Sequence, residues 1–294
     1  MSTGKRIGIV GIGAMGMAMA RNLHRKGFPV AVRDIRSEAE QQARACGMQV
    51  CPSAASLARE SALIIIVVVN AAQIDEVLFG IDGVVHGAAA GTTVMLCSTI
   101  APQDTVSFAQ RLAQHDIDTI DAPVSGGPAR AEAGTMSMML AAGDALLQRH
   151  EQVLDALGDK RFVISAAVGD GAKAKLVNNL LAGINLVAGA EALALGIKLG
   201  LEPGKLFDVI CASSGASWIF QDRMARALKD DFSPRAFAHI LTKDVTLATA
   251  LADNAQYDTP LGDAALAAFR RTLESGFGAL DDAAVIKTYL QEAQ

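Results

Sequence analysis

The sequence predicts an α/β fold in which an N-terminal, doubly wound Rossmann sheet is followed by an all-α domain. Short β-rich runs alternate with helical patterns up to about residue 165, which is typical of a parallel sheet covered on both faces. A glycine-rich turn follows the first run, and only helical periodicity appears after residue 165. We therefore expect two domains, 1–165 and 166–294, and 294 residues suffice to bury a large core.

The first strand is expected at residues 5–10, and the glycine turn after it leads into a helix that begins at Ala14 and ends near Lys26. A second strand covers 29–33, and Ser37 opens a helix with two glutamates in its first turn, which suits the helix dipole. The alternation continues with strands near 48–50, 62–69, 94–97 and 117–121 and helices near 53–60, 71–79 and 102–115. The apolar run 62–69 is typical of a central parallel strand and is too short to cross a bilayer.

A long helix is expected to open the second domain. Apolar residues recur at helical spacing from Gly171 to about Leu199, a length of about 43 Å. Asn185 and Glu191 interrupt this run, so we interpret it as a core helix of a soluble protein and not as a membrane span. Further helices are expected to start near Pro203, Trp218, Pro234, Pro260 and Asp281.

Composition excludes several classes of function. The chain is 51% hydrophobic and 19% charged, with 26 basic and 31 acidic residues and a net charge of −5, which argues against disorder, nucleic-acid binding and binding to anionic membranes. Four cysteines without C-x-x-C spacing indicate no disulfide framework and favour a cytoplasmic location. The five histidines stand far apart, so we expect no metal site, and the N-terminus does not resemble a signal peptide.

A dinucleotide-binding motif lies between the first strand and the first helix. It comprises Gly11, Ile12, Gly13, Ala14, Met15 and Gly16. Gly11 allows the tight turn, Gly13 lets the backbone approach a pyrophosphate, and Gly16 permits close packing of helix on strand. Asp34, 18 residues after Gly16 at the end of the second strand, is placed to accept hydrogen bonds from a ribose hydroxyl. The alternative is a glycine-rich turn that binds nothing.

Asp34 also bears on the choice between NAD and NADP. A carboxylate at this position repels a 2′-phosphate, whereas Arg33 and Arg36 beside it could stabilise one. We expect NAD, with NADP as the alternative.

A second motif, D-A-P-V-S-G-G-P, begins at Asp121 just where a strand is expected to end. Ser125, Gly126 and Gly127 offer consecutive backbone N–H groups, a nest that suits a carboxylate. The carboxyl ends of parallel strands are also where open α/β sheets bind ligands. The alternative is an ordinary tight turn between two prolines.

Two further motifs lie in the expected helical domain. In G-D-G-A-K-A-K-L-V-N-N, Lys175 and Asn179 are four residues apart and share one helix face. A partly desolvated lysine has a lowered pKa and suits general acid–base chemistry, although a helical lysine is usually a solvated surface charge. The pair Lys243 and Asp244, in L-T-K-D, would by itself be an ordinary surface ion pair.

Taken together, G-I-V-G-I-G-A-M-G, D-A-P-V-S-G-G-P, G-D-G-A-K-A-K-L-V-N-N and L-T-K-D resemble, in order, the motifs of the β-hydroxyacid dehydrogenase family. That family includes 3-hydroxyisobutyrate dehydrogenase and tartronate semialdehyde reductase. The resemblance covers essentially the whole chain. It implies a Rossmann domain followed by a 6-phosphogluconate-dehydrogenase-like helical domain, and a homodimer or homotetramer formed through the helical domain.

The resemblance also implies roles for individual residues. Lys175 matches the catalytic lysine, which takes the proton of the substrate hydroxyl as hydride leaves for the nicotinamide. The residues implied for substrate binding are Ser125, Gly126, Gly127, Asn179 and Asp244. Besides the glycine motif and Asp34, the residues implied for cofactor binding are Val69, Asn70, Thr99 and Lys243.

A narrower resemblance points to the L-threonate dehydrogenase branch of the family. It rests on V-V-N-A-A-Q-I-D-E-V-L-F-G, which departs from the more usual M-L-P, and on G-A-S-W-I-F-Q-D-R-M and D-D-A-A-V-I-K. Members of that branch oxidise the C2 hydroxyl of a four-carbon sugar acid with NAD, and Asp34 agrees with that cofactor. Trp218 and Phe237 are candidates for the residues that select the substrate.

Three alternatives stay open at this point. The substrate could be 3-hydroxyisobutyrate or tartronate semialdehyde, because the same residues serve these reactions. The chain could be an imine reductase, but those enzymes generally have another residue at the lysine position. It could also be a catalytically silent dinucleotide-binding sensor, in which Lys175 or Asn179 would be lost, yet both are present.

Overall fold

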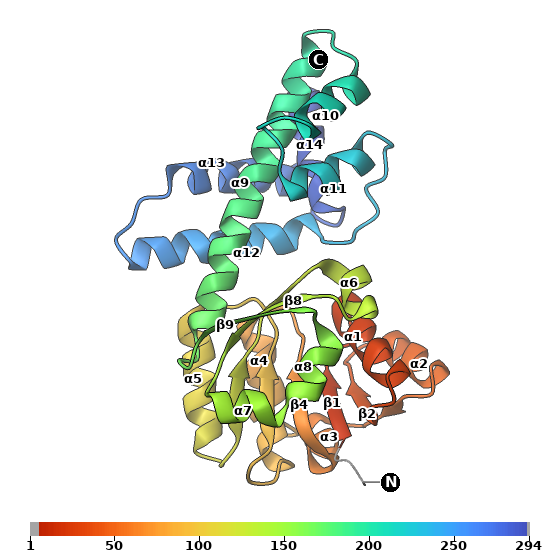
Figure 1. The fold of residues 1–294 in the computed structure, drawn as a ribbon, viewed down its shortest axis with the longest axis vertical. Coiled ribbons are helices and arrows are strands. Elements are labelled where there is room, and N and C mark those ends of the chain that lie inside the picture. The colour runs from red at the N-terminus through yellow and green to blue at the C-terminus, as the bar shows by residue number, and fades with distance from the viewer. Residues whose placement is uncertain (1–5, 293–294) are drawn as a thin grey trace. The chain divides into compact units, whose positions relative to one another are not determined.

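The chain folds into two compact units, the first ending at Lys175 and the second beginning at Leu176. The computed structural model describes residues 6–292. The first unit extends beyond residue 165, where the sequence placed the boundary, because the first turn of helix α9 (Asp170–Lys198) hydrogen-bonds to the end of a strand in the first unit. Figure 1 shows the course of the chain through both units.

A nine-stranded sheet forms the centre of the first unit, in the order β3-β2-β1-β4-β5-β6-β8-β7, with β9 paired to β8. Its strands are β1 (Arg6–Val10), β2 (Val30–Arg33), β3 (Gln49–Val50), β4 (Ser61–Ile66), β5 (Thr93–Leu96), β6 (Asp118–Asp121), β7 (Val124–Ser125), β8 (Ser137–Ala141) and β9 (Lys160–Ser165). The strands β1 to β6 pair in parallel, as expected. However, β8 runs antiparallel to β6 and β7, so the expectation of a purely parallel sheet was wrong for this end.

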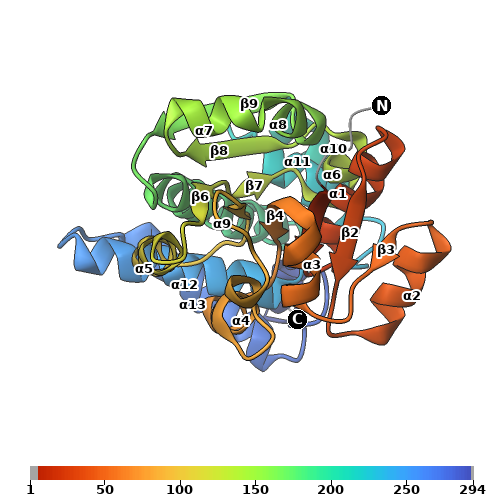
Figure 2. The same ribbon diagram turned by 90° about the horizontal axis from the view of Figure 1, so that it is seen from below.

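Helices cover both faces of the sheet. On one face α1 (Ala14–Arg25), α2 (Ser37–Ala45), α6 (Gly127–Ala133) and α8 (Glu151–Leu157) share a core with the strands, and α7 (Asp144–Arg149) packs at its border. On the other face α3 (Ala54–Glu60), α4 (Ala71–Phe79) and α5 (Pro102–Ala113) do the same (Figure 2). Burial from both sides explains why β4 is almost entirely apolar.

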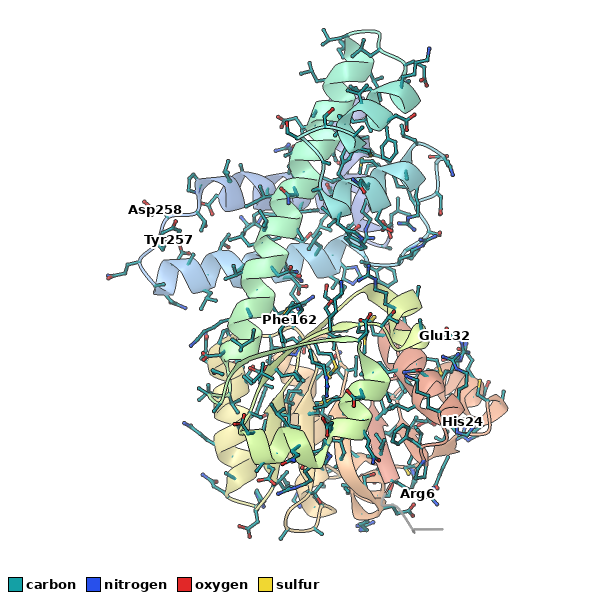
Figure 3. The ribbon with its side chains drawn as sticks, in the orientation of Figure 1. Arg6, His24, Glu132, Phe162, Tyr257 and Asp258 are labelled. Carbon is teal, nitrogen blue, oxygen red and sulfur yellow. The ribbon has the colours of Figure 1, made fainter. Side chains whose placement is uncertain are left out.

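The second unit is helical, as its periodicity predicted. Besides most of α9, it comprises α10 (Pro203–Cys211), α11 (Trp218–Ala227), α12 (Ala238–Asn254), α13 (Pro260–Glu274) and α14 (Val285–Glu292). Its core gathers Leu186 and Leu193 from α9 around Phe220 and Phe269. Tyr257 and Asp258 lie in the turn between α12 and α13 (Figure 3).

Helix α9 is less buried than a core helix would be. It has the length and apolar composition of a membrane span, and only 39% of its most apolar 18-residue window is buried. The exposed apolar side chains include Val177, Leu181 and Leu195. The sequence-based interpretation of α9 as a core helix therefore holds for one face only.

Candidate active site

The glycine-rich turn has the geometry that a dinucleotide requires. Gly11 adopts φ +86°, and a Cβ there would lie 2.4 Å from the carbonyl oxygen of Val67. A Cβ on Gly16 would lie 2.0 Å from the carbonyl oxygen of Gly11, so the helix can approach the strand only with glycine at this position. A Cβ on Gly13 would meet only Arg36, at 3.6 Å. Gly13 is also the N-cap of α1 and has no side chain to accept from the first-turn N–H groups, which leaves them to face an anion.

Asp34 lies directly behind this turn. Its carboxylate is 6% exposed and accepts the N–H of Ile12 at 2.8 Å through Oδ2. The guanidinium of Arg36 clamps both carboxylate oxygens, with Nε 3.0 Å from Oδ1 and Nη2 3.1 Å from Oδ2. Burial opposes ionisation of Asp34, but the hydrogen bonds from Arg36 and Ile12 outweigh it and hold the pKa of the carboxyl below its usual value. Arg33 is turned toward Glu40, at 2.6 Å.

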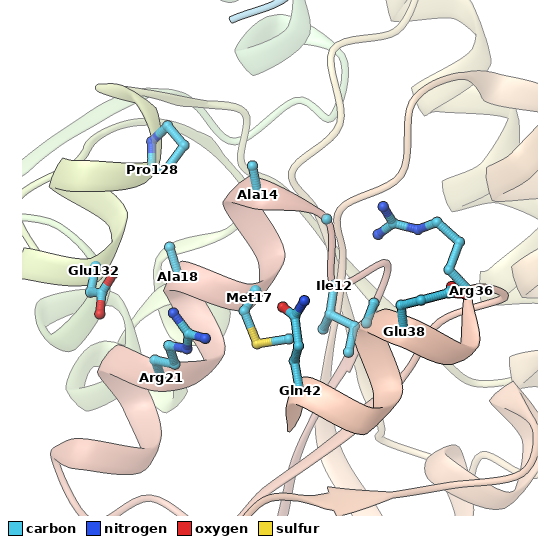
Figure 4. Close-up of a pocket in the computed structure, with 12 residues that line it drawn as sticks. Ile12, Ala14, Met17, Ala18, Arg21, Arg36, Glu38, Gln42, Pro128 and Glu132 are labelled. Atoms are coloured by element: carbon cyan, nitrogen blue, oxygen red, sulfur yellow. The ribbon is translucent and has the colours of Figure 1, made fainter. Parts of the chain in front are cut away.

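A cavity of about 390 Å³ opens beside the glycine turn (Figure 4). Its walls come from α1, α2 and α6 together with the turn itself, and include Ile12, Gly13, Ala14, Met17, Arg21, Arg36, Gln42 and Glu132. Neither Ser125 nor Lys175 lines it. This cavity therefore adjoins the predicted cofactor residues and is separate from the predicted substrate residues.

The other predicted cofactor residues of the first unit follow the ends of β4 and β5. The N–H of Val68 donates to the hydroxyl of Ser98 at 3.0 Å, which ties these two strand ends together. Thr99 comes next and is half-buried, whereas Val69 is 47% exposed. Asn70 is the N-cap of α4, and its side chain accepts the N–H of Gln73 at 2.9 Å. Asn70 thus has a structural role that the sequence analysis missed.

The predicted carboxylate nest forms the turn between β7 and α6. Gly126 and Gly127 adopt φ values of +132° and +70°, which favour glycine strongly. A Cβ on Gly127 would meet nothing within 4 Å, so its backbone borders open space. Ser125, Gly126 and Gly127 are all half-buried. These features suit a backbone anion site, and the identity of its ligand stays a prediction.

Lys175 and Asn179 are both buried, at 7% and 8% exposure, one turn apart on α9. A solvated surface lysine is therefore excluded. In the second unit, the amide of Asn179 donates to Oδ2 of Asp244 at 2.7 Å, and the ammonium of Lys243 donates to Oδ1 at 2.7 Å. Because Asp244 is only 5% exposed, it orients Asn179 in addition to pairing with Lys243, and an ordinary surface pair is the wrong description.

One buried carboxylate of the first unit received no role from the sequence. Asp121, at the end of β6, is 1% exposed and accepts the N–H groups of Gly169 and Ala172 at 2.8 and 3.0 Å. Burial raises the pKa of Asp121 to about 6, although these backbone hydrogen bonds act in the opposite direction. The sequence signal was available, since an acid stands between apolar residues at the end of a core strand.

A Rossmann sheet with this glycine turn, together with a buried lysine and amide on one helix face, defines a dinucleotide-dependent oxidoreductase. Comparison with known proteins agrees. Residues 6–166 match the NAD-binding domain of 6-phosphogluconate dehydrogenase. Residues 169–289 match the NAD-binding domain of NADP-dependent 3-hydroxyisobutyrate dehydrogenase.

Several relatives carry the name L-threonate dehydrogenase. The one from Cupriavidus necator is 38% identical over 97% of this chain and 96% of its own, and the one from Escherichia coli K12 is 38% identical over 98% and 97%. A crystal structure titled 3-hydroxyisobutyrate dehydrogenase from Salmonella typhimurium superposes with a TM-score of 0.90 at 36% identity, covering 97% of this chain and 100% of that one. The chain belongs to the β-hydroxyacid dehydrogenase family.

Proposed function

We propose that this oxidoreductase is an NAD-dependent L-threonate dehydrogenase, which oxidises the C2 hydroxyl of L-threonate to the 2-oxo acid. The observation that carries the proposal is the pair of buried polar side chains, Lys175 and Asn179, one turn apart on α9. The substrate follows the relatives named L-threonate dehydrogenase, which match over nearly the full chain. A cytoplasmic location goes with this proposal and rests on cysteine usage alone.

The residues divide the chemistry as follows. Bound NAD supplies the hydride acceptor. The N–H groups of Ser125, Gly126 and Gly127 bind the substrate carboxylate, and Asn179 hydrogen-bonds the substrate beside the reacting carbon. With the cofactor bound, Lys175 would take the proton of the C2 hydroxyl as the hydride leaves C2, and C2 would become a ketone. The overall change is L-threonate plus NAD⁺ to 2-oxo acid, NADH and a proton.

The preference for NAD rests on how the two nearby arginines are engaged. Arg33 pairs with Glu40 and Arg36 pairs with Asp34, so a 2′-phosphate would have to take Arg36 away from a buried carboxylate. A ribose hydroxyl needs no such exchange, because it can donate to Asp34 directly.

A second candidate substrate is 3-hydroxyisobutyrate, after which the 36% identical Salmonella typhimurium protein is named. The same residues would take a proton and a hydride from that substrate. Tartronate semialdehyde, reduced in the opposite direction, belongs to the same class. These candidates differ from L-threonate only in the side chains that meet the rest of the substrate.

Absorbance at 340 nm separates these candidates. The purified chain is mixed with NAD⁺ or NADP⁺ and with L-threonate, D-erythronate, D-threonate, L-tartrate, D-glycerate or 3-hydroxyisobutyrate. We expect NAD⁺ reduction with L-threonate to exceed that with the other acids by at least about tenfold. Turnover with 3-hydroxyisobutyrate or D-glycerate alone would keep the family chemistry and discard the substrate.

The role of Lys175 has its own test. We expect Lys175→Ala to lower kcat by about 10³-fold, because general acid–base groups contribute roughly 10²–10⁴-fold, while NADH fluorescence gives an unchanged Kd. Lys173→Ala is the matched control, since that lysine is exposed and pairs with Asp170. Turnover of Lys175→Ala within tenfold of the parent would disprove the assigned role. A parent that binds NADH but oxidises none of the acids would favour a silent sensor.

A further inference from the structure

We propose that Asp121 is the positioning residue for Lys175: its buried carboxylate holds the N-terminus of α9 and thereby fixes where the lysine stands. This inference rests on the function proposed for Lys175. Lys175 follows Ala172 by three residues, about one helical turn. A shift of the first turn of α9 therefore moves the amine with it.

The contact between the carboxylate and the helix is direct and buried. Oδ2 of Asp121 accepts the N–H of Gly169 at 2.8 Å and that of Ala172 at 3.0 Å, and the N–H of Gly171 also hydrogen-bonds to this carboxylate. These are N–H groups that the first turn of a helix cannot satisfy internally. A carboxylate from another element thus caps α9, where the helix dipole favours negative charge.

Glycines at the N-terminus of α9 permit this close contact with the Asp121 carboxylate. A Cβ on Gly171 would lie 2.9 Å from Cγ of Asp121 and 2.7 Å from the carbonyl oxygen of Met139. Gly169 adopts φ +103°, a conformation that side chains disfavour. Glycine at these two positions allows the helix backbone to approach the carboxylate within hydrogen-bonding distance.

The other side of the contact is equally fixed. Asp121 pairs with Leu96 of β5 and with Ala141 of β8, so strands on both sides hold its backbone. Ser125, the first residue of the predicted carboxylate nest, follows four residues later. Asp121 therefore links the strand that leads to the substrate-carboxylate turn with the helix that carries the proposed base, both within the first unit.

The titratable groups that interact with Asp121 come from two other segments of the chain. Asp170 on α9 and Cys97 after β5 both interact electrostatically with it. Burial, and then the charge of Asp121, raise the pKa of the Cys97 thiol, so Cys97 stays neutral. Asp170 is turned away toward Ser165 and Lys173, at 2.6 and 2.7 Å.

Two substitutions test the proposal with L-threonate and NAD⁺, or with whichever acid of the panel turns over. Asp121→Ala removes the acceptor, and we expect kcat to fall about 100-fold, the cost of a misplacement of about 1 Å, with the Kd of NADH unchanged within about twofold. Asp121→Asn retains an acceptor oxygen and should keep kcat within about fivefold. Asp170→Asn, which removes a carboxylate from the same helical turn, is the control and should leave kcat unchanged.

A double-mutant cycle separates positioning of the lysine from general damage. In the Lys175→Ala background, Asp121→Ala should lower the residual turnover by less than about twofold, because the group it positions is gone. A full 100-fold loss in that background, or unchanged kcat in Asp121→Ala alone, would overturn the proposal. If Lys175→Ala itself leaves turnover intact, the proposed function fails instead.

A third variant approaches the contact from the helix side. Gly171→Ala places a methyl group against Asp121 and should lower kcat by at least about tenfold with NADH binding retained, even if Asp121→Ala does not fold. Faster hydrogen exchange at Gly169 and Ala172 in this variant would show that the cap is loosened. Full activity of Gly171→Ala with parental exchange at these amides would contradict the proposal.

Discussion

In the proposed function, the effect of Asp34 on cofactor choice depends on its partners as much as on its own charge. Because Arg36 clamps both carboxylate oxygens, removing the carboxylate also releases a guanidinium beside the ribose position. We expect Asp34→Ser to raise the preference for NADPH over NADH by about 100-fold, from lost repulsion and one new charge-assisted contact. Fluorescence titrations with both reduced cofactors measure it. An unchanged ratio would mean that Arg36 does not reach the 2′-phosphate.

Asp121 gives the stability of the protein a pH dependence. Its pKa is raised to about 6 in the folded state, so between pH 4 and 6 the folded chain binds more protons than the unfolded one. The contribution of Asp121 to the free energy of unfolding therefore falls as pH rises through that window. We expect denaturant unfolding at pH 4 to 7 to show that Asp121→Asn loses this decline. An identical pH dependence in the parent and Asp121→Asn would contradict the raised pKa.

At the scale of elements, α9 packs closely against its neighbours through glycines. A Cβ on Gly189 would lie 2.4 Å from the ring of Phe220, which is 1% exposed and cannot turn aside. Alanine would favour the helix by about 1 kcal/mol, but overpacking a core costs about 1–3 kcal/mol. We therefore expect Gly189→Ala to lower the free energy of unfolding by up to about 2 kcal/mol, measured by denaturant titration.

A matched control for that substitution is Gly143→Ala. Gly143 has a negative φ, and no atom lies within 4 Å of an added Cβ. The Gly143→Ala variant should therefore have the same free energy of unfolding as the parent. If Gly189→Ala were as stable as Gly143→Ala, the core around Phe220 would have to be looser than the contact distances indicate.

At the scale of the whole molecule, α9 has an exposed apolar face. Val177, Leu181 and Leu195 on α9, and Leu199 just after its end, are between 58% and 70% exposed. Their separations of 4, 14 and 4 residues keep them on one face of the helix. An apolar stripe of this kind marks an interaction surface. We propose that it is covered by a second copy of the chain, in a homodimer or homotetramer.

Light scattering coupled to size exclusion tests the oligomer. We expect the parent to elute at twice or four times its 30.5 kDa mass, and Leu181→Glu with Leu195→Glu to shift it to the monomer, because a buried charge without a partner opposes association. Ile81→Glu is the control, since Ile81 is 91% exposed but lies outside the stripe. A monomeric parent would disprove the proposal.

The sequence by itself determined the alternation of strands and helices, the glycine turn, the long helix and the family. These features are local: periodicity, turn residues and motif spacing all act within a few residues. The helix expected from Gly171 to about Leu199 and the observed α9 (Asp170–Lys198) differ by one residue at each end. The antiparallel pairing of β8 was not predicted, because pairing direction depends on residues far apart in the chain.

Only the tertiary structure decided which polar groups act on one another. Asp121 and Gly169 are 48 residues apart, and Asn179 and Asp244 are 65 apart, so no local pattern predicts these contacts. The pairing of Arg36 with Asp34 likewise depends on side-chain geometry. From the sequence alone, Arg36 could equally have been free to bind a 2′-phosphate. Burial makes these contacts consequential, because a buried carboxylate must find donors and thereby fixes the elements that supply them.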